Sequence, residues 1–193
     1  MSLNYDQKKL HLLKTGEEVL AKYGFTGLGL SKLLQISGIP KGSFYYYFSS
    51  KEEYGVAVIE YYIAQQLAYM KSLFSNTNFT MREKLICYWK NWYTSQCLDE
   101  CKGRCLIVKL SCEVADFSTS MRIAFCKGID QIIVLLCDAI TQGQQDGTIS
   151  ETLNAQQTAK QLYQQWLGAS LVVKLQHREE SFAIAMELTE SIL

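Results

Sequence analysis

A single proline, Pro40, interrupts the 193 residues of this chain. Because proline breaks helix interiors, a chain that nearly lacks it is free to form long helices. Five segments combine helical spacing of apolar residues with the absence of proline, which favours helix. They are residues 5–23, 51–74, 81–97, 118–141 and 154–176. The sequence therefore predicts an all-α protein.

Short helices are predicted between the first two of these long ones. A helix with one apolar face covers residues 30–36, residues 37–38 break it, and a second short helix begins at Pro40. Two short helices joined by a glycine-containing turn are the outline of a helix-turn-helix. Ser50 then offers a helix cap, with Glu53 three residues later as in a capping box.

Positive charge is concentrated at the start of the chain. The net charge of the whole chain is zero, but residues 1–51 hold seven lysines and three carboxylates, which gives +4 there and −4 in the remainder. Proteins that coat nucleic acid without specificity are usually strongly basic overall. Any contact with DNA is therefore expected to be local and to lie in the N-terminal quarter.

The residues from Gly24-Phe25 and from Leu30 to Glu52 closely resemble the signature of the TetR family of transcriptional repressors. The resemblance implies an all-α, TetR-type fold with a three-helix DNA-binding head at residues 1–50. Residues 51–193 would form a helical sensor and dimerisation body. Members of the family bind a pseudo-palindromic operator in double-stranded DNA as homodimers, so two heads are expected to read two half-sites.

The resemblance also implies which residues contact DNA. The helix from Pro40 to Tyr46 enters the major groove in the family, and a tyrosine and a lysine that correspond to Tyr45 and Lys51 contact phosphates. Lysine ammonium groups and tyrosine hydroxyls are suited to phosphate oxygens. The remaining candidates, which would face the groove, are Lys41, Ser43 and Tyr46.

Other residues of the head are expected to be structural. Phe44, Tyr47 and Phe48 are predicted to belong to the hydrophobic core. The family commonly has threonine or serine just before the second helix, where this chain has Leu28-Gly29. A phosphate contact from that position is therefore not expected.

The body resembles the electrophile- and oxidant-responsive group of the family typified by the N-ethylmaleimide reductase repressor (NemR). The segments Cys105-Leu106-Ile107-Val108-Lys109-Leu110-Ser111 and Trp166-Leu167-Gly168-Ala169 carry this resemblance, together with Lys174. It implies that Cys105 is the sensing thiol and that Lys174 is its partner. A free thiol has a pKa of about 8.5, so a nearby cation favours the reactive thiolate. Alternatively, Lys174 reaches solvent near a helix end.

The other cysteines have simpler interpretations. Cys87, Cys126 and Cys137 lie in apolar helices and are expected to be buried as small hydrophobic side chains. Whether Cys105 is alkylated, oxidised or linked to Cys97, Cys101 or Cys112 stays open. The spacing of the cysteines lacks a CxxC pair and the chain has two histidines, so neither a metal nor another cofactor is expected.

Two rival functions remain. The repressor could instead be induced by a hydrophobic or aromatic ligand held noncovalently in a pocket lined by Trp89, Trp92, Tyr93 and Trp166. The chain could also be a helical adaptor that binds other proteins. The dimer surface is expected on the helices around residues 118–141 and 154–176.

Enzymes and membrane proteins are not expected. The chain has no phosphate-binding loop, HExxH or GxSxG motif, and the carboxylates of Glu113 and Asp116 are better explained as surface or helix-capping groups. Without an apolar run of about 18 residues or a basic-then-apolar leader, the chain is expected to be cytoplasmic.

Overall fold

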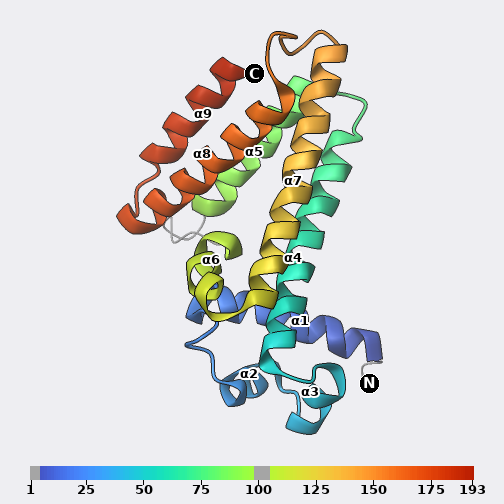
Figure 1. The fold of residues 1–193 in the computed structure, drawn as a ribbon, viewed down its shortest axis with the longest axis vertical. Coiled ribbons are helices and arrows are strands. Elements are labelled where there is room, and N and C mark those ends of the chain that lie inside the picture. Colours follow the sequence, from blue (N-terminus) through green and yellow to red (C-terminus); the bar gives the residue numbers. More distant parts are fainter. Residues whose placement is uncertain (1–4, 98–104) are drawn as a thin grey trace. The chain divides into compact units, whose positions relative to one another are not determined.

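The computed structural model describes residues 5–97 and 105–193, and within these ranges the chain forms nine helices and no strand (Figure 1). The all-α prediction is confirmed. The helices are α1 (Tyr5–Tyr23), α2 (Leu30–Ser37), α3 (Lys41–Tyr47), α4 (Lys51–Phe74), α5 (Met81–Cys97), α6 (Leu106–Phe117), α7 (Thr119–Gln145), α8 (Ala155–Gln176) and α9 (Glu180–Ile192).

Three helices differ from the prediction, and the first of them, α6, was not among the predicted helices. The end predicted for α7 at residue 141 was wrong, because the helix continues to Gln145. Gly143 lies inside it, where an added Cβ would come within 2.5 Å of Ile149 Cδ1, so this glycine permits close packing instead of ending the helix. The chain turns at Gly147, which has φ +75°. Helix α9 was not predicted at all.

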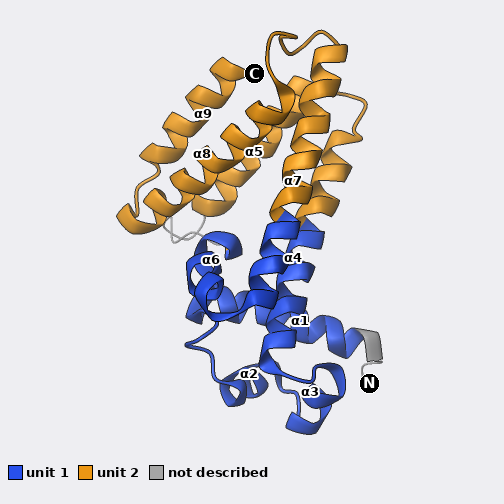
Figure 2. Ribbon diagram, viewed as in Figure 1, with its two compact units in different colours: residues 1–65, 106–128 blue, residues 66–105, 129–193 orange. Residues whose placement is uncertain are grey.

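The chain divides into two compact units (Figure 2). Unit 1 consists of the described residues up to 65 together with 106–128, and unit 2 consists of 66–97, 105 and 129–193. Helices α4 and α7 each begin in unit 1 and end in unit 2. The three helices of the head, α1, α2 and α3, therefore share their unit with α6.

The core of unit 1 joins α1, α3 and the start of α4. Tyr54 is 1% exposed and donates a hydrogen bond from its hydroxyl to the carbonyl oxygen of Leu12 at 2.8 Å. Its ring lies 5.4 Å from that of Phe44 and 5.1 Å from that of Phe48, measured between centroids. Gly16 allows this approach, because a Cβ there would lie 2.1 Å from the Tyr54 hydroxyl oxygen.

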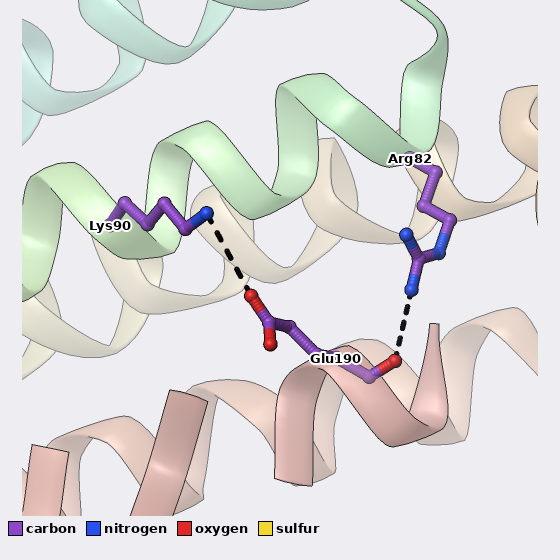
Figure 3. A network of polar contacts seen from close by, with 3 residues as sticks. All are labelled: Arg82, Lys90 and Glu190. Atoms are coloured by element: carbon purple, nitrogen blue, oxygen red, sulfur yellow. Dashed lines mark hydrogen bonds and ion pairs between the residues drawn. The ribbon is translucent and has the colours of Figure 1, made fainter. Parts of the chain in front are cut away.

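Stacked aromatic rings from α5, α8 and α9 form the core of unit 2. Trp166 stacks on Trp89 with centroids 5.0 Å apart, and Phe182 stacks on Trp166 at 5.7 Å. At the surface, Glu190 of α9 meets α5 through its carbonyl oxygen, which accepts a hydrogen bond from Arg82 at 3.0 Å (Figure 3). Its carboxylate pairs with Lys90 at 3.8 Å. Because this ion pair is exposed, it is expected to stabilise unit 2 less than the buried aromatic stack does.

None of the described helices is long and apolar enough to span a lipid bilayer.

Candidate DNA interface and sensor site

The turn between α2 and α3 has the geometry of a helix-turn-helix. Gly38 ends α2 in the left-handed region at φ 65°, and α3 begins directly after Pro40. His11 of α1 donates from Nε2 to the carbonyl oxygen of Ser37 at 3.0 Å. This bond fastens the end of α2 to the first helix.

Helix α3 presents one face to solvent and buries the other. Tyr45 and Tyr46 are 48% and 73% exposed, Lys41 is exposed and Ser43 is half-buried. On the opposite face lie the residues expected to be structural. The predicted burial of Phe44 and Phe48 is confirmed, and Tyr47 is half-buried. The residues predicted to contact DNA thus share a helix whose other face is fixed by the core, and the contacts themselves stay a prediction.

Lys51 makes contacts within the head that the sequence did not predict. Its Nζ donates to the carbonyl oxygen of Phe25 at 2.6 Å and lies 4.3 Å from the centroid of the Phe25 ring. Burial lowers the pKa of Lys51, and the carboxylate of Glu113 partly opposes that shift. An ammonium group has three hydrogens, so a phosphate contact remains chemically open.

The start of α2 offers no phosphate contact, as expected from Leu28-Gly29 in place of the family's threonine or serine. Gly29 is the N-cap and makes no side-chain cap bond, and Leu28 is 1% exposed. A buried leucine and a glycine offer neither a capping oxygen nor a hydroxyl for phosphate.

Glu113 of α6 closes the turn between α1 and α2. Its Oε2 accepts from the amide of Phe25 at 3.0 Å, and its Oε1 accepts from the amide of Thr26 at 2.5 Å and from the Thr26 hydroxyl. Burial raises the pKa of Glu113, but the hydrogen bonds from Thr26 and Phe25 outweigh this and hold it below its usual value. No local sequence signal reveals this role, since the partners are 87 and 88 residues apart.

The candidate sensor thiol is buried. Cys105 is 3% exposed, and its amide donates to Gln96 Oε1 at 3.1 Å immediately before α6 begins. Burial raises the pKa of both Tyr88 and Tyr163, and Cys105 contributes to each shift, so the two phenols lie within electrostatic range of the thiol. Lys174 is half-buried in the last turn of α8. Its pairing with Cys105 stays a prediction.

The burial predicted for two of the other cysteines is wrong. Cys87 and Cys126 are exposed, and Cys137 is half-buried. The helices that carry them have a solvent-facing side despite their apolar composition, and a small side chain on that side costs little. Of the three cysteines predicted as possible partners of Cys105, Cys112 is exposed, Cys97 is half-buried, and Cys101 lies outside the described residues.

The structure brings the predicted ligand-pocket residues together. Trp92 lies 5.7 Å from Trp89 and 6.3 Å from Trp166 between ring centroids, and Tyr93 packs against Phe182 at 5.5 Å. The indole nitrogen of Trp92 donates to Ser170 and that of Trp166 to Thr189, both at 3.0 Å. By contrast, the buried Trp89 Nε1 and Tyr163 hydroxyl have no hydrogen-bond partner among the described residues.

Comparison with known proteins identifies the family. Residues 12–53 match the model of bacterial regulatory proteins of the tetR family, and residues 82–189 match the tetracyclin repressor-like C-terminal domain. The chain belongs to the TetR family. Its relatives are therefore transcriptional regulators and not enzymes.

Individual TetR-family relatives cover nearly the whole chain. The transcriptional repressor NemR of Escherichia coli K12 is 37% identical over 95% of this chain and 92% of its own length. The repressor DhaR of a Mycobacterium species is 26% identical over 88% of this chain and 84% of its own length. The crystal structure of reduced E. coli NemR matches with a TM-score of 0.91, at 36% identity and 96% coverage of both chains.

A regulatory protein of Rhodobacter sphaeroides matches with a TM-score of 0.86 at 22% identity, over 94% of this chain and 96% of that one. At that identity the match supports the shared fold only.

Proposed function

We propose that this chain is a transcriptional repressor whose homodimer leaves its operator when a reactive electrophile or oxidant modifies Cys105. The observation that carries the proposal is the similarity to the repressor NemR, which extends through both the head and the body at 37% identity. The exposed face of α3, with Lys41, Tyr45 and Tyr46, supplies the hydroxyls and positive charge that an operator requires.

Homodimerisation would place two α3 helices in successive major grooves, about 34 to 36 Å apart. The sequence predicts the dimer surface on residues 118–141 and 154–176. Exposed apolar side chains support α8 as part of that surface and add α9, which the sequence did not predict. Leu171 and Leu175 are 48% and 73% exposed on α8, and Ile184 and Leu188 are 51% and 46% exposed on α9. Each pair is four residues apart and so lies on one face of its helix.

The proposed reaction at Cys105 begins with its thiolate. With N-ethylmaleimide as the probe, the sulfur adds to the carbon–carbon double bond, one S–C bond forms, and the displaced electron pair takes up a proton from solvent. Because Cys105 is 3% exposed, the reagent reaches it only when the protein opens locally. Coupling of about 3 kcal/mol between thiol and head would then weaken operator binding more than a hundredfold.

The test is a gel shift on the DNA upstream of the protein's own gene, with and without N-ethylmaleimide. Exposed thiols complicate a simple experiment, so two variants are compared: one in which Cys87, Cys112 and Cys126 are serine, and the single substitution Cys105→Ser. Release of the first variant and retention of the second would support the proposal. Release of Cys105→Ser to the same extent as wild type contradicts it.

An oxidant such as hypochlorite provides a second arm of the test. Oxidation of a thiol to a sulfenic acid or a disulfide is reversed by dithiothreitol, whereas the maleimide adduct is not. Recovery of binding after reductant is therefore expected only in the oxidant arm. The regulated gene is proposed to be a neighbouring detoxifying reductase.

A noncovalent inducer is a second candidate, favoured by one observation. The aromatic cluster around Trp89 contains two buried polar atoms, Trp89 Nε1 and the Tyr163 hydroxyl, that lack partners among the described residues. Buried donors without acceptors are destabilising, and an aromatic ligand with an acceptor atom would satisfy them. Release of Cys105→Ser by such a compound, without adduct formation in the mass spectrum, would favour this candidate.

A further inference from the structure

Helix α6 connects the candidate thiol to the head by chain continuity and by packing. Cys105 is the residue directly before Leu106, where α6 begins. The helix belongs to unit 1 and packs against α1. A change in backbone position at residue 105 is therefore applied directly to a helix that lies within the same compact unit as α2 and α3.

The carboxylate of Glu113 is the group through which α6 holds the α1–α2 turn. It accepts three hydrogen bonds, from the Phe25 amide, the Thr26 amide and the Thr26 hydroxyl. Bonds from backbone amides to a carboxylate are charge-assisted and hence stronger than neutral ones. They are also directional, so a small displacement of α6 weakens all three together.

The α1–α2 turn leaves room for the Glu113 carboxylate at Gly24. Gly24 has φ +75°, a region that residues with a Cβ rarely adopt. A Cβ at this position would also come within 2.7 Å of Glu113 Oε2. Glycine at residue 24 thus favours the backbone conformation of the turn and leaves room for the Glu113 carboxylate.

Phe25 contacts both Glu113 and Lys51 through its backbone. Its amide donates to Glu113, while its carbonyl oxygen accepts from Lys51 Nζ at 2.6 Å. The ring of Phe25 lies under the same ammonium group and packs against Phe117 at the end of α6, with centroids 5.7 Å apart. One residue of the turn therefore contacts both α6 and the lysine that begins α4 next to α3.

A second contact holds the other end of α6. Glu52, the neighbour of Lys51, accepts hydrogen bonds from the hydroxyls of Ser118 at 2.5 Å and Ser120 at 2.6 Å. Ser118 follows α6 directly. The start of α4 is thus bound to the end of α6 as well as to the turn that Glu113 holds.

We propose that Glu113 is a positioning residue that keeps the reading head in its operator-binding arrangement and transmits to it any displacement of α6 that starts at Cys105. The inference rests on the proposed function of Cys105. It assigns no DNA contact to Glu113, which acts through Phe25, Thr26 and Lys51.

The test measures operator affinity before and after modification of Cys105 by N-ethylmaleimide, with the extent of modification determined by mass spectrometry. Glu113→Gln keeps the size of the side chain but removes its charge and turns one acceptor into a donor that faces backbone amides. The matched control is Asp116→Asn, an exposed carboxylate on the same helix for which the described residues provide no hydrogen bond or ion pair.

For Glu113→Gln, operator affinity without reagent is expected to fall roughly tenfold, because the turn is already released. Alkylation should then cause little or no further fall in the operator affinity of this variant. The rate of Cys105 alkylation should be the same as in wild type. Asp116→Asn should match wild type in all three measurements. A lowered melting temperature with an unchanged alkylation response would show that Glu113 is merely structural and would overturn the proposal.

A milder variant covers the case in which Glu113→Gln fails to fold. Thr26→Val removes one of the three hydrogen bonds at an exposed position, and it should give a smaller change in the same direction. Wild-type behaviour of this variant, with circular dichroism confirming its fold, would contradict the proposal. If the wild-type protein is itself not released on alkylation, the proposed sensing by Cys105 fails, and the affinity of Glu113→Gln without reagent still tests the positioning role.

Discussion

Both compact units have a core of packed aromatic rings, but they differ in the polar contacts that surround it. In unit 1, directional polar contacts add to the packing of Tyr54 on Phe44 and Phe48: Glu113 accepts from the α1–α2 turn, and Lys51 donates to the carbonyl oxygen of Phe25. In unit 2, α5, α8 and α9 are held by stacked aromatic rings centred on Trp166. Apolar packing depends on buried area, whereas hydrogen bonds depend on distance and angle.

This difference suits a regulator. Hydrophobic packing is non-directional, so a small displacement that leaves the rings buried costs less than one that breaks a directional contact. The same displacement breaks a charge-assisted hydrogen bond, so its effect is concentrated on the contacts that hold the head. We therefore expect substitutions in the aromatic core of unit 2 to change mainly stability, and substitutions in the head to change mainly operator affinity.

The largest effect is expected from Trp166→Ala in unit 2. Trp166 is fully buried, so its truncation leaves a cavity and should lower the free energy of unfolding by about 3–5 kcal/mol. Urea denaturation followed by far-UV circular dichroism measures this at equal protein concentration for both proteins. A loss of less than about 1 kcal/mol would refute the idea that the aromatic stack carries the stability of unit 2.

Tyr46→Ala should separate control from stability in unit 1. The side chain is 73% exposed, so the free energy of unfolding should change by no more than about 0.5 kcal/mol. Operator affinity should nevertheless fall about tenfold, because the proposed contact of Tyr46 with DNA would be lost. Fluorescence anisotropy with labelled operator gives the dissociation constant. Phe79→Ala, at a 54% exposed aromatic residue of unit 2, is the control and should leave affinity unchanged.

Tyr163→Phe removes a buried hydroxyl that has no partner among the described residues. A buried polar atom without a partner is unfavourable, so stability should stay the same or rise by up to about 1 kcal/mol. Operator affinity should not change. A marked loss of stability in the same denaturation experiment would mean that this hydroxyl is satisfied by a bound water or ligand.

The smallest effect concerns pH. The folded-state pKa of Glu113 lies below its usual value, so its carboxylate stabilises the fold above the unfolded pKa of about 4.3. That contribution is lost as pH falls through the folded pKa. Unfolding free energies measured between about pH 5 and 3 should therefore fall less steeply for Glu113→Gln than for wild type. Equal slopes of unfolding free energy against pH for the two proteins would show that the hydrogen bonds to Glu113 do not measurably stabilise the fold.

Local sequence patterns were enough to predict most of the helices. Long proline-free segments with apolar periodicity correctly indicated α1, α4, α5 and α8, because helix formation depends on residues three and four apart. Ser50 does cap α4, since its hydroxyl accepts from the Glu53 amide at 3.0 Å, but the Glu53 carboxylate bonds to Ser49. The pattern of the head likewise indicated which face of α3 is buried.

By itself, the sequence determined the helical class, the location of the head and the outward face of α3, because these follow from local periodicity and from the resemblance to a family. Only the tertiary structure decided that Glu113 holds Phe25 and Thr26, that Lys51 is bonded to a backbone carbonyl, and that Cys87 and Cys126 face solvent. Those contacts join residues far apart in the chain, and burial depends on which side of a helix its neighbours cover. Both are properties of packing that no short stretch of sequence contains.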